Sequence, residues 1–448
     1  MRLAPLTGLF GTNSSGKSSI LQFLLMLKQT ADSPDRAQVL YFGEEKSEKS
    51  LAVLGTFDDV LHKSSNERRL TWTLEWKLPK ALKVADPQDT RKGPIMTGAE
   101  VELSCEVEDV GGGQLVVREM AYSFASHRFS MCSTPAPDRD PERKSAARKY
   151  SLNADGGAFH FERGRGGPLV GLPPPIKCYG FPPQIRAAYS NAGFLSDLEY
   201  AFEQQMQRVF YLGPLREYPF RDYRWSGAEP IDMGRRGEKV VSALLAAKQR
   251  GAMVGRGRGR KSLEEKVAAW LKNLGLIHDF GVEEIKKESN LYRVFVQRSS
   301  NSARVLLPDV GFGVSQVLPV IVLCYYVPEG STILLEQPEI HLHPKVQEGL
   351  ADVLIDAVKS RKVQVLIESH SEHLLRRLQR RIAEETFKPE DAALYFCDAK
   401  NGASDLVPLD VTMYGEIRNW PTDFFGSEFD ELAKCMEAKL KRMQSRPA

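Results

Sequence analysis

The chain has 448 residues, of which 42% are hydrophobic and 27% charged, and its formal net charge is +3. This length allows two or three domains of about 100–200 residues each, and the composition excludes a disordered or fibrous protein. A net charge this small does not by itself indicate a nucleic-acid partner. The longest apolar run, 317–327, is much shorter than the roughly 20 residues of a membrane helix.

The cysteines and the first residues indicate where the protein works. Six cysteines are scattered along the chain without a C-x-x-C pair or another metal-binding spacing, which is typical of free thiols in a reducing compartment. The beginning, MRLAPLTGLFGTNSSGKSS, lacks the apolar stretch and the cleavage site of a signal peptide. We therefore expect a cytoplasmic protein that makes no membrane contact.

The first predicted elements are a strand, a glycine-rich loop and a helix. Residues 6–10 form a short apolar run, residues 18–27 have helical composition, and GTNSSGKS at 11–18 matches G-x-x-x-x-G-K-[ST] at every fixed position. Such a loop points backbone N–H groups at phosphate oxygens at the start of a helix, while the lysine reaches the β- and γ-phosphates and the last hydroxyl binds Mg²⁺. A chance Gly/Ser-rich loop would not need a strand before it and a helix after it. The predicted ATP and Mg²⁺ site consists of Gly11, Asn13, Ser14, Ser15, Gly16, Lys17, Ser18 and Ser19.

The pattern then changes twice along the chain. Between about residues 70 and 164, short alternating segments separated by Gly, Pro and Asp predict antiparallel strands. Residues 195–209 and 261–274 have helical periodicity. Beyond residue 291, the expected strands are 292–297, 303–307, 332–336 and 364–368, and the expected helices are 315–326 and 345–359. Alternating strands and helices predict a mostly parallel sheet.

The segment STILLEQPEIHLHP, residues 331–344, has the form of a Walker B strand and the turn after it. Glu336 would then reach the Mg²⁺ ion through a water molecule. The alternative is a core strand that ends in a polar turn. The pair His341 and His343 raises the possibility of zinc, but no third ligand occurs at a metal-binding spacing.

Two further segments carry candidate phosphate contacts. In QVLIESHSEHLL, residues 364–375, His370 follows a buried strand and would sense a γ-phosphate, unless it is a structural or capping histidine. In PDVGFGVSQVLPVIV, residues 308–322, Gly313, Ser315 and Gln316 open an apolar helix. Ser315 on its own is most simply a helix cap, although the same geometry would present its hydroxyl to a phosphate.

Taken in order, these four motifs resemble the ABC ATPases of the SMC and OLD (overcoming lysogenization defect) type, above all the stand-alone bacterial AAA family ATPases often found in defence islands. The segments EQPEIHLHP and ESHSEHLL are the most specific, and VFYLGPLREYP at 209–219 and NWPTDFF at 419–425 look like blocks of the same family. The resemblance covers most of the chain and is weak over 63–199.

The resemblance implies an α/β fold, a P-loop NTPase of ABC/SMC-like type with a mostly parallel sheet, an antiparallel β subdomain and a helical insertion. We expect the ATPase lobe to comprise 1–63 and 291–448, with the β-rich region at 64–190 and the helical insertion at 191–290. It also implies a head-to-tail homodimer that binds two ATP molecules. Lys17 and Ser18 of one subunit would hold each triphosphate, and Gly313, Ser315 and Gln316 of the other would close over its γ-phosphate.

The sequence departs from the family pattern in two places. Gln337 stands where these enzymes usually have a catalytic Glu, and an amide can orient a water but cannot accept its proton. Glu339 would be the substitute base, so we expect slow hydrolysis or a switch that is gated by ATP binding. In addition, only ten residues precede Gly11, where the family usually has a further strand. We expect either a longer protein or a lobe completed in another way.

The expected function is an ATPase whose dimerisation regulates a separate effector protein, a nuclease or a toxin, in anti-phage defence or DNA surveillance. A TOPRIM nuclease cluster is not recognisable after His370. One alternative is a DNA-binding repair or chromosome-maintenance ATPase, with residues 139–149 and 250–261 as candidate phosphate contacts. The other is a transporter nucleotide-binding subunit, which the β region and the absence of an LSGGQ sequence disfavour.

Overall fold

The computed structural model describes residues 1–45, 47, 50–63, 67–85, 93–134, 149–164, 171–255, 259–400, 403–421, 436 and 438. The chain forms two compact units, one from Met1–Leu21 and Arg208–Ala448 and the other from Gln22–Gln207. This partition is coarser than the four segments expected from the sequence, which stay a prediction.

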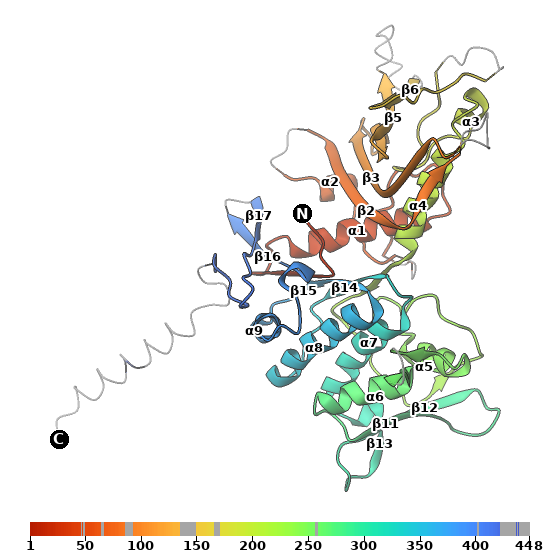
Figure 1. The fold of residues 1–448 in the computed structure, drawn as a ribbon. Coiled ribbons are helices and arrows are strands. Elements are labelled where there is room, and N and C mark those ends of the chain that lie inside the picture. The colour runs from red at the N-terminus through yellow and green to blue at the C-terminus, as the bar shows by residue number, and fades with distance from the viewer. Residues whose placement is uncertain are drawn as a thin grey trace. The chain divides into compact units, whose positions relative to one another are not determined.

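A six-stranded sheet is the centre of the first unit, and its strand order is β17-β16-β1-β15-β14-β7 (Figure 1). The strands are β1 (Leu6–Gly11), β7 (Val209–Leu212), β14 (Thr332–Glu336), β15 (Gln364–Glu368), β16 (Ala392–Lys400) and β17 (Ala403–Pro408). Every neighbouring pair is parallel except β16 and β17. The predicted mostly parallel sheet is therefore confirmed.

The central strands of this sheet are apolar because both of their faces are covered. All six residues of β1 are buried, and so are the apolar residues of β14 and β15, as expected for parallel strands in an α/β fold. Parallel strands bring their carboxyl ends to one edge of the sheet. The polar residues that follow β1, β14 and β15 therefore meet at that edge.

The helices of the first unit bury their apolar residues in the same core as these strands. They are α5 (Val240–Gln249), α6 (Leu263–Asn273), α7 (Phe312–Tyr326), α8 (Pro344–Arg361) and α9 (Glu372–Ala383). Helix α7 is buried from Val314 to Tyr325 and packs against α5, α6 and α8, while α8 also packs against α9. The helices predicted at 261–274, 315–326 and 345–359 are confirmed, and α7 begins three residues earlier than expected.

The unit also has a smaller antiparallel sheet with β11 (Asp279–Glu284), β12 (Leu291–Gln297) and β13 (Arg304–Leu306), to which β8 (Tyr223–Arg224) adds by pairing with β12. Strands β9 (Met253–Val254) and β10 (Lys261–Ser262) form a short hairpin. The segment 191–290, expected to be a helical insertion, therefore also contributes β7 to the parallel sheet and several strands to the smaller sheets.

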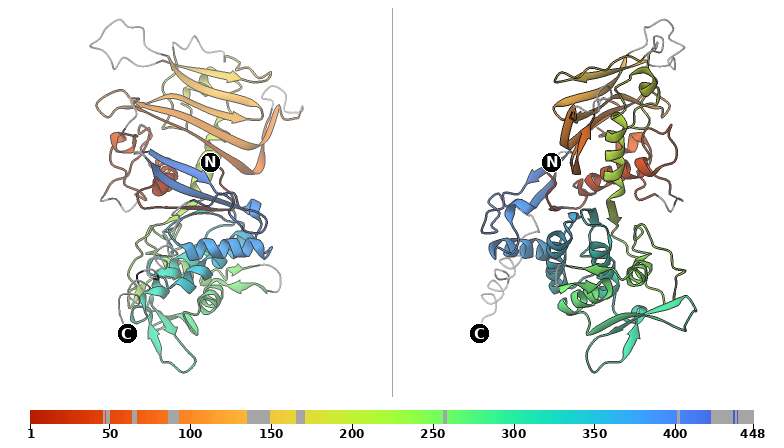
Figure 2. Two further views of the ribbon diagram at one scale, coloured as in Figure 1. Left: turned by 90° about the vertical axis from the view of Figure 1, so that its left-hand side faces the viewer. Right: turned by 45° about the vertical axis from the view of Figure 1, so that its right-hand side comes forward.

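The second unit contains a five-stranded antiparallel sheet in which the strands follow one another in chain order (Figure 2). The strands are β2 (Arg69–Val84), β3 (Met96–Asp109), β4 (Leu115–Phe124), β5 (His127–Thr134) and β6 (Lys149–Asp155). The helices are α1 (Lys17–Asp32), which begins in the first unit, with α2 (Phe57–Val60), α3 (Gln184–Ala188) and α4 (Leu195–Gln207). The predicted antiparallel region is confirmed. Among all the described residues, no helix has the length and apolar character needed to cross a membrane.

Candidate functional site

The loop between β1 and α1 adopts a conformation that only glycine accommodates easily. Gly11 has φ +134° and Gly16 has φ +84°, both in the region that side chains disfavour. A Cβ atom on Gly11 would also lie 2.2 Å from the Cys397 carbonyl oxygen of β16. The loop is closed by two bonds, from the Ser15 hydroxyl to the Thr12 carbonyl oxygen (2.8 Å) and from the Ser19 N–H to the Gly16 carbonyl oxygen (3.2 Å).

Lys17 turns back into this loop and is only 3% exposed. Its Nζ donates to the carbonyl oxygens of Gly11 (3.2 Å) and Thr12 (2.5 Å). Burial lowers the pKa of Lys17, while the nearby Glu368, Cys397 and Glu339 act in the opposite direction. The loop and the first turn of α1 thus gather all the residues predicted for the phosphate site, with Asn13, Ser14 and Ser19 exposed and Ser18 partly buried.

Two carboxylates stand side by side at the ends of β14 and β15. Glu336 is the register partner of Glu368, which in turn pairs with Leu9 of β1. Neighbouring strands lie about 4.8 Å apart, and paired residues point to the same face. Burial, followed by the charge of Glu368, raises the pKa of Glu336 to about 7, and a hydrogen bond from Tyr211 of β7 opposes that rise. One oxygen of Glu368, Oε2, is buried without a hydrogen-bond partner.

The turn after β14 carries two more of the predicted catalytic residues. Gln337 has a left-handed backbone (φ 41°), and its N–H donates to the Glu368 carbonyl oxygen (2.8 Å). The buried side chain of Glu339 accepts a hydrogen bond from the His370 N–H at Oε1 (2.7 Å), whereas its Oε2 has no partner. Burial raises the pKa of Glu339. The turn is therefore fastened to the end of β15 by hydrogen bonds at both residues.

His370 joins this turn to the phosphate loop. It follows β15 by two residues, and its ring is hydrogen-bonded to the Gly11 backbone. Burial and the nearby Lys17 lower the pKa of His370. Ser369, next to it, donates its N–H to the Leu9 carbonyl oxygen (3.0 Å). The structure therefore brings together Gly11, Lys17, Glu336, Glu339 and His370, which are far apart in the sequence.

Comparison with known protein families gives two matches. Residues 259–375, which include α6, α7, β14, α8, β15 and the first four residues of α9, match the AAA ATPase domain family. Residues 387–434 match a protein family of unknown function, DUF3696, and this match includes the NWPTDFF segment. The resemblance to AAA family ATPases is confirmed. The phosphate loop lies outside both matched ranges, and residues 422–425 of NWPTDFF lie outside the described part of the chain.

Several solved structures of SMC head domains are similar to the chain at low sequence identity. An SMC head bound to the C-terminal winged-helix domain of ScpA is 10% identical over 90% of each chain, with a TM-score of 0.43. The SMC head domain of Thermotoga maritima is 11% identical over 92% of this chain and 93% of its own, with a TM-score of 0.36. An SMC head from Pyrococcus furiosus is 9% identical over 96% and 92%, with a TM-score of 0.38. No curated protein matches the chain.

Within the matched range 259–375, Gly313, Ser315 and Gln316 lie in the first turns of α7. The N-cap of this helix is Gly311, so the interpretation of Ser315 as a helix cap is wrong. Its hydroxyl instead donates to the Phe312 carbonyl oxygen three residues back (2.8 Å). In the part of the chain that the structure describes, no hydrogen bond or ion pair joins this segment to residues 11–19 of the same chain.

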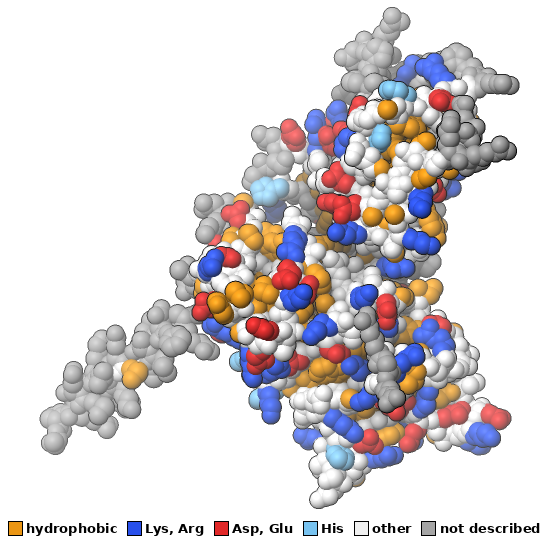
Figure 3. Space-filling model, in the orientation of Figure 1, with side chains coloured by type: hydrophobic (Ala, Val, Ile, Leu, Met, Phe, Trp, Pro, Cys, Tyr) orange, Lys and Arg blue, Asp and Glu red, His pale blue; other side chains and the backbone are white. Residues whose placement is uncertain are grey.

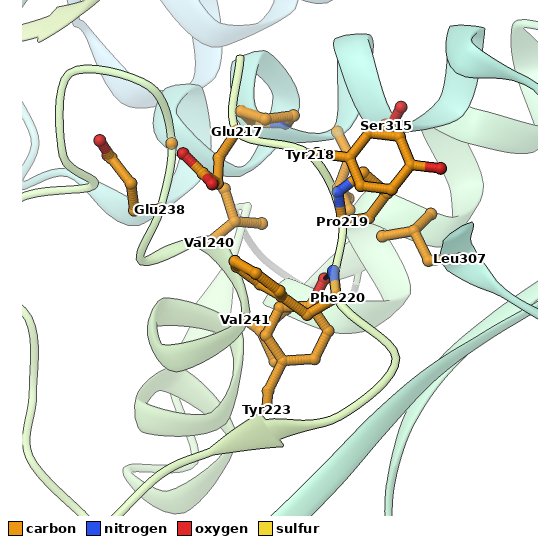
Figure 4. A pocket seen from close by; sticks show the side chains of 13 residues that line it. Glu217, Tyr218, Pro219, Phe220, Tyr223, Glu238, Val240, Val241, Leu307 and Ser315 are labelled. Carbon is orange, nitrogen blue, oxygen red and sulfur yellow. Dashed lines mark hydrogen bonds between the residues drawn. The ribbon is translucent and has the colours of Figure 1, made fainter.

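Ser315 borders a small pocket, formed largely by residues between β7 and α5 together with α7 (Figure 4). Tyr218, Phe220, Val241 and Leu307 are among the other lining residues. Tyr218 and Phe312 are 58% and 60% exposed, and their rings lie 6.1 Å apart. Apolar side chains are thus exposed beside the beginning of α7.

The two histidines that raised the question of zinc, His341 and His343, contact neighbouring groups of the protein. His343 is the N-cap of α8, where its Nδ1 accepts from the Lys345 N–H (3.3 Å). The His341 ring lies 6.3 Å from the Phe312 ring. Within the described ranges there is no group of three His, Cys, Asp or Glu side chains placed to hold a metal ion.

Sequence reasoning missed three residues of the site, namely Tyr211, Arg216 and Glu368. Tyr211 pairs with Leu334 in the sheet and therefore shares a face with Glu336. Arg216 is only 6% exposed, and the charges of Tyr211, Glu339 and Glu336 act on it. Glu368 lies in the segment that drew attention to His370. Only the register of β15 against β14 could reveal that it faces Glu336.

Proposed function

We propose that this chain binds ATP with Mg²⁺ in the loop of residues 11–19 and hydrolyses it slowly. The observation that carries the proposal is the position of Lys17, whose ammonium is held inside a glycine-shaped loop near the carboxylates of Glu368, at the end of β15, and Glu339, in the turn after β14. A cationic loop that faces carboxylates is what a complex of a phosphate chain and a divalent cation requires.

Each residue of the site has a role in this proposal. Lys17 and the N–H groups of the loop bind the β- and γ-phosphates, and Ser18 and Glu336 hold the Mg²⁺ ion, Glu336 through a water molecule. The residues fit the ion because Mg²⁺ keeps few protein ligands and completes its shell with waters and phosphate oxygens. The ion neutralises charge on the phosphates. The unpartnered Glu368 oxygen adds a further buried acceptor at this edge.

The second part of the proposal concerns hydrolysis. Gln337 cannot accept a proton, so it orients water at most. Glu339 has one carboxylate oxygen held by the His370 N–H and the other without a partner, which leaves a site for a proton. Because the group is buried and its backbone contact is fixed, we expect turnover to be slow.

The base assignment is tested by turnover of Glu339→Gln and Gln337→Glu. Loss of activity in the first variant and a gain in the second support the assignment. Wild-type turnover that survives Glu339→Gln excludes Glu339 as the base.

The third part of the proposal is a head-to-tail homodimer that forms when ATP binds. Among the described residues, no hydrogen bond or ion pair joins Ser315 and its neighbours to the phosphate loop of their own chain. Exposed Phe312 and Tyr218 lie beside them. Both features support closure of this surface over the nucleotide of a second copy. The resemblance of the motifs supports the further proposal that dimerisation regulates a separate effector, a nuclease or a toxin, in cytoplasmic anti-phage defence or DNA surveillance.

Direct DNA binding stays a prediction without an observation in its favour. Residues 139–148 and 256–258 of the two candidate basic segments lie outside the described residues. On the face seen in Figure 3, Lys and Arg side chains are interspersed with Asp and Glu over the described part of the surface. A mixed surface of this kind does not create the field that attracts a phosphate backbone.

The primary experiment measures Mg–ATP binding by calorimetry for the wild-type chain, Lys17→Ala and the control Lys28→Ala. Lys28 lies on the same helix and forms a partly exposed ion pair with Asp32, so its removal leaves the loop unchanged. We expect the wild type and Lys28→Ala to bind and Lys17→Ala to lose binding. Equal binding by Lys17→Ala would refute the nucleotide site. Light scattering with and without ATP then tests for the dimer.

A further inference from the structure

Arg216 occupies an unusual position in the segment that follows β7. The segment is fixed on both sides of it, because the Gly213 N–H donates to the Arg235 carbonyl oxygen (2.7 Å) and the Glu217 N–H donates to the Arg236 carbonyl oxygen (2.9 Å). The preceding Leu215 is 68% exposed, whereas Arg216 is buried. The backbone therefore directs a cationic side chain inward and an apolar one outward, the reverse of the usual arrangement.

The buried guanidinium has no partner for its two terminal nitrogens. Nη1 and Nη2 are both inaccessible and make no hydrogen bond. Among the ion pairs between described residues, Arg216 forms none, although Glu336 and Glu339 are near enough for their charges to act on it. Burial of a cation is unfavourable unless an anion and hydrogen bonds compensate for the lost water, so this side chain lacks an anionic partner.

At the same edge of the sheet, carboxylate oxygens lack a hydrogen-bond donor. Glu339 Oε2 and Glu368 Oε2 are buried carboxylate oxygens without a hydrogen-bond partner. The Arg216 guanidinium and these two carboxylate oxygens therefore lie in the same region but form no hydrogen bond with each other. A complex of a phosphate chain and Mg²⁺ satisfies both, because its oxygens accept from a guanidinium and its cation attracts carboxylates.

We propose that Arg216 binds the γ-phosphate of ATP from within the same chain and thereby makes the site select the triphosphate over the diphosphate. The inference rests on the proposed function, since it assigns a role within that nucleotide site. The planar fork of an arginine matches two phosphate oxygens at once. The γ-phosphate is the group concerned because Arg216 lies near the carboxylates of β14 and its turn, where the proposed hydrolysis takes place. Lys17 and the loop that follows β1 also hold the β-phosphate, which ATP and ADP share.

The alternative is that Arg216 is a structural cation that holds Glu336 and Glu339 in place at a distance. A structural cation stabilises the carboxylates whether the nucleotide has two phosphates or three. The two roles therefore differ in the ratio of ATP to ADP affinity, and this ratio is insensitive to a general loss of folded protein.

The experiment measures dissociation constants for Mg–ADP and for a non-hydrolysable Mg–ATP analogue by calorimetry. The variants are Arg216→Ala, Arg216→Lys and, as the matched control, Arg236→Ala. Arg236 lies in the neighbouring loop segment, and its exposed side chain forms an ion pair with Glu217 (3.4 Å). We expect Arg216→Ala to reduce the preference for the triphosphate about tenfold or more, as for loss of a charged hydrogen bond. Arg216→Lys should recover part of it, and Arg236→Ala should keep all of it.

Each outcome has a defined meaning. An equal loss of both affinities, or an unchanged ratio, in Arg216→Ala overturns the inference. If that variant shows no unfolding transition, the ratio in Arg216→Lys decides instead, because the lysine preserves the charge and loses the fork. If the wild-type chain binds neither nucleotide, the proposed function fails rather than the role of Arg216.

Discussion

The charge of Glu336 depends on the fold. Its pKa rises from 4.5 to about 7, because burial and the neighbouring Glu368 both disfavour the ionised form. The folded chain therefore binds a proton that the unfolded chain has released between these two pH values. Stability falls as the pH rises through this window, and it stays lower above pH 7.

We therefore predict that Glu336→Gln stabilises the nucleotide-free protein at pH 8 and has little effect at pH 5. The shift of about 2.5 pH units corresponds to about 3 kcal/mol in the free energy of unfolding. Urea unfolding of both proteins at the two pH values measures the difference. Glu283→Gln, which alters an exposed carboxylate, serves as the control. A stability difference that is the same at pH 5 and pH 8 would contradict the assigned cause.

Gly11 and Gly16 test how rigid the phosphate loop is. Both have positive φ, but a Cβ on Gly11 would meet the Cys397 backbone at 2.2 Å, whereas a Cβ on Gly16 would meet only the Ser404 side chain at 3.0 Å. Backbone atoms move away from an added Cβ less readily than the atoms of a side chain do. We expect Gly16→Ala to lower the free energy of unfolding by about 1–2 kcal/mol, the usual cost of a left-handed residue, and Gly11→Ala to lower it by more.

Thermal unfolding of both variants measures this difference. Gly111→Ala is the control, because Gly111 has φ +112° with no atom within 4 Å of the added Cβ, so it isolates the cost of the backbone angle. If Gly11→Ala is no less stable than Gly111→Ala, the contact with β16 does not constrain the loop.

At the scale of elements, the beginning of α9 holds the backbone next to His370 in place. Ser371 caps this helix by accepting from the Leu374 N–H (3.0 Å) and donates to Gln347 Oε1 (2.6 Å). The residue before it, His370, touches the phosphate loop. We predict that Ser371→Ala lowers stability by about 1 kcal/mol and also weakens Mg–ATP binding.

Ser262 provides the matched control for that prediction. It caps α6 by accepting from the Glu265 N–H (3.2 Å) in a capping box, and within the described part of the chain its hydrogen bonds do not reach the phosphate loop. We expect Ser262→Ala to have a similar effect on the thermal midpoint while leaving the ATP affinity unchanged. Equal affinities in the two variants would show that the start of α9 does not position His370 for the nucleotide.

The elements also show what local sequence can predict. Apolar runs and helical periodicity predict strands β1, β14 and β15 and helices α6, α7 and α8. The buried face of each of these elements is determined by residues that are close together in the sequence. The strand β7 could not be assigned from four residues, since its place depends on pairing with β14, more than a hundred residues further along. Glu368 and Arg216 were missed for the same reason. Register and burial bring them to the site, and neither is encoded locally.

At the scale of the whole molecule, the site is incomplete within one chain if the proposed dimer is correct. The phosphate loop would come from one copy and the beginning of α7 from the other. Two inactive variants can then restore each other. Lys17→Ala removes the loop contact, and Ser315→Arg places a bulky cation where the proposed partner nucleotide would bind. Because Ser315 is mostly buried in the free chain and bonds the Phe312 carbonyl oxygen, the thermal midpoint of Ser315→Arg must first show that this variant still folds.

We predict that each variant alone is inactive and that an equal mixture recovers about a quarter of the wild-type ATPase activity, because half of the randomly paired dimers would contain one intact site of two. The Ser315→Arg chain supplies its loop and the Lys17→Ala chain supplies its α7. Turnover measured against the total protein concentration tests this, with Lys28→Ala mixed with Lys17→Ala as a control that has one active component. A mixture of the two inactive variants that stays inactive, while each still shows a wild-type thermal midpoint, would mean that the loop and α7 do not share a nucleotide across two copies.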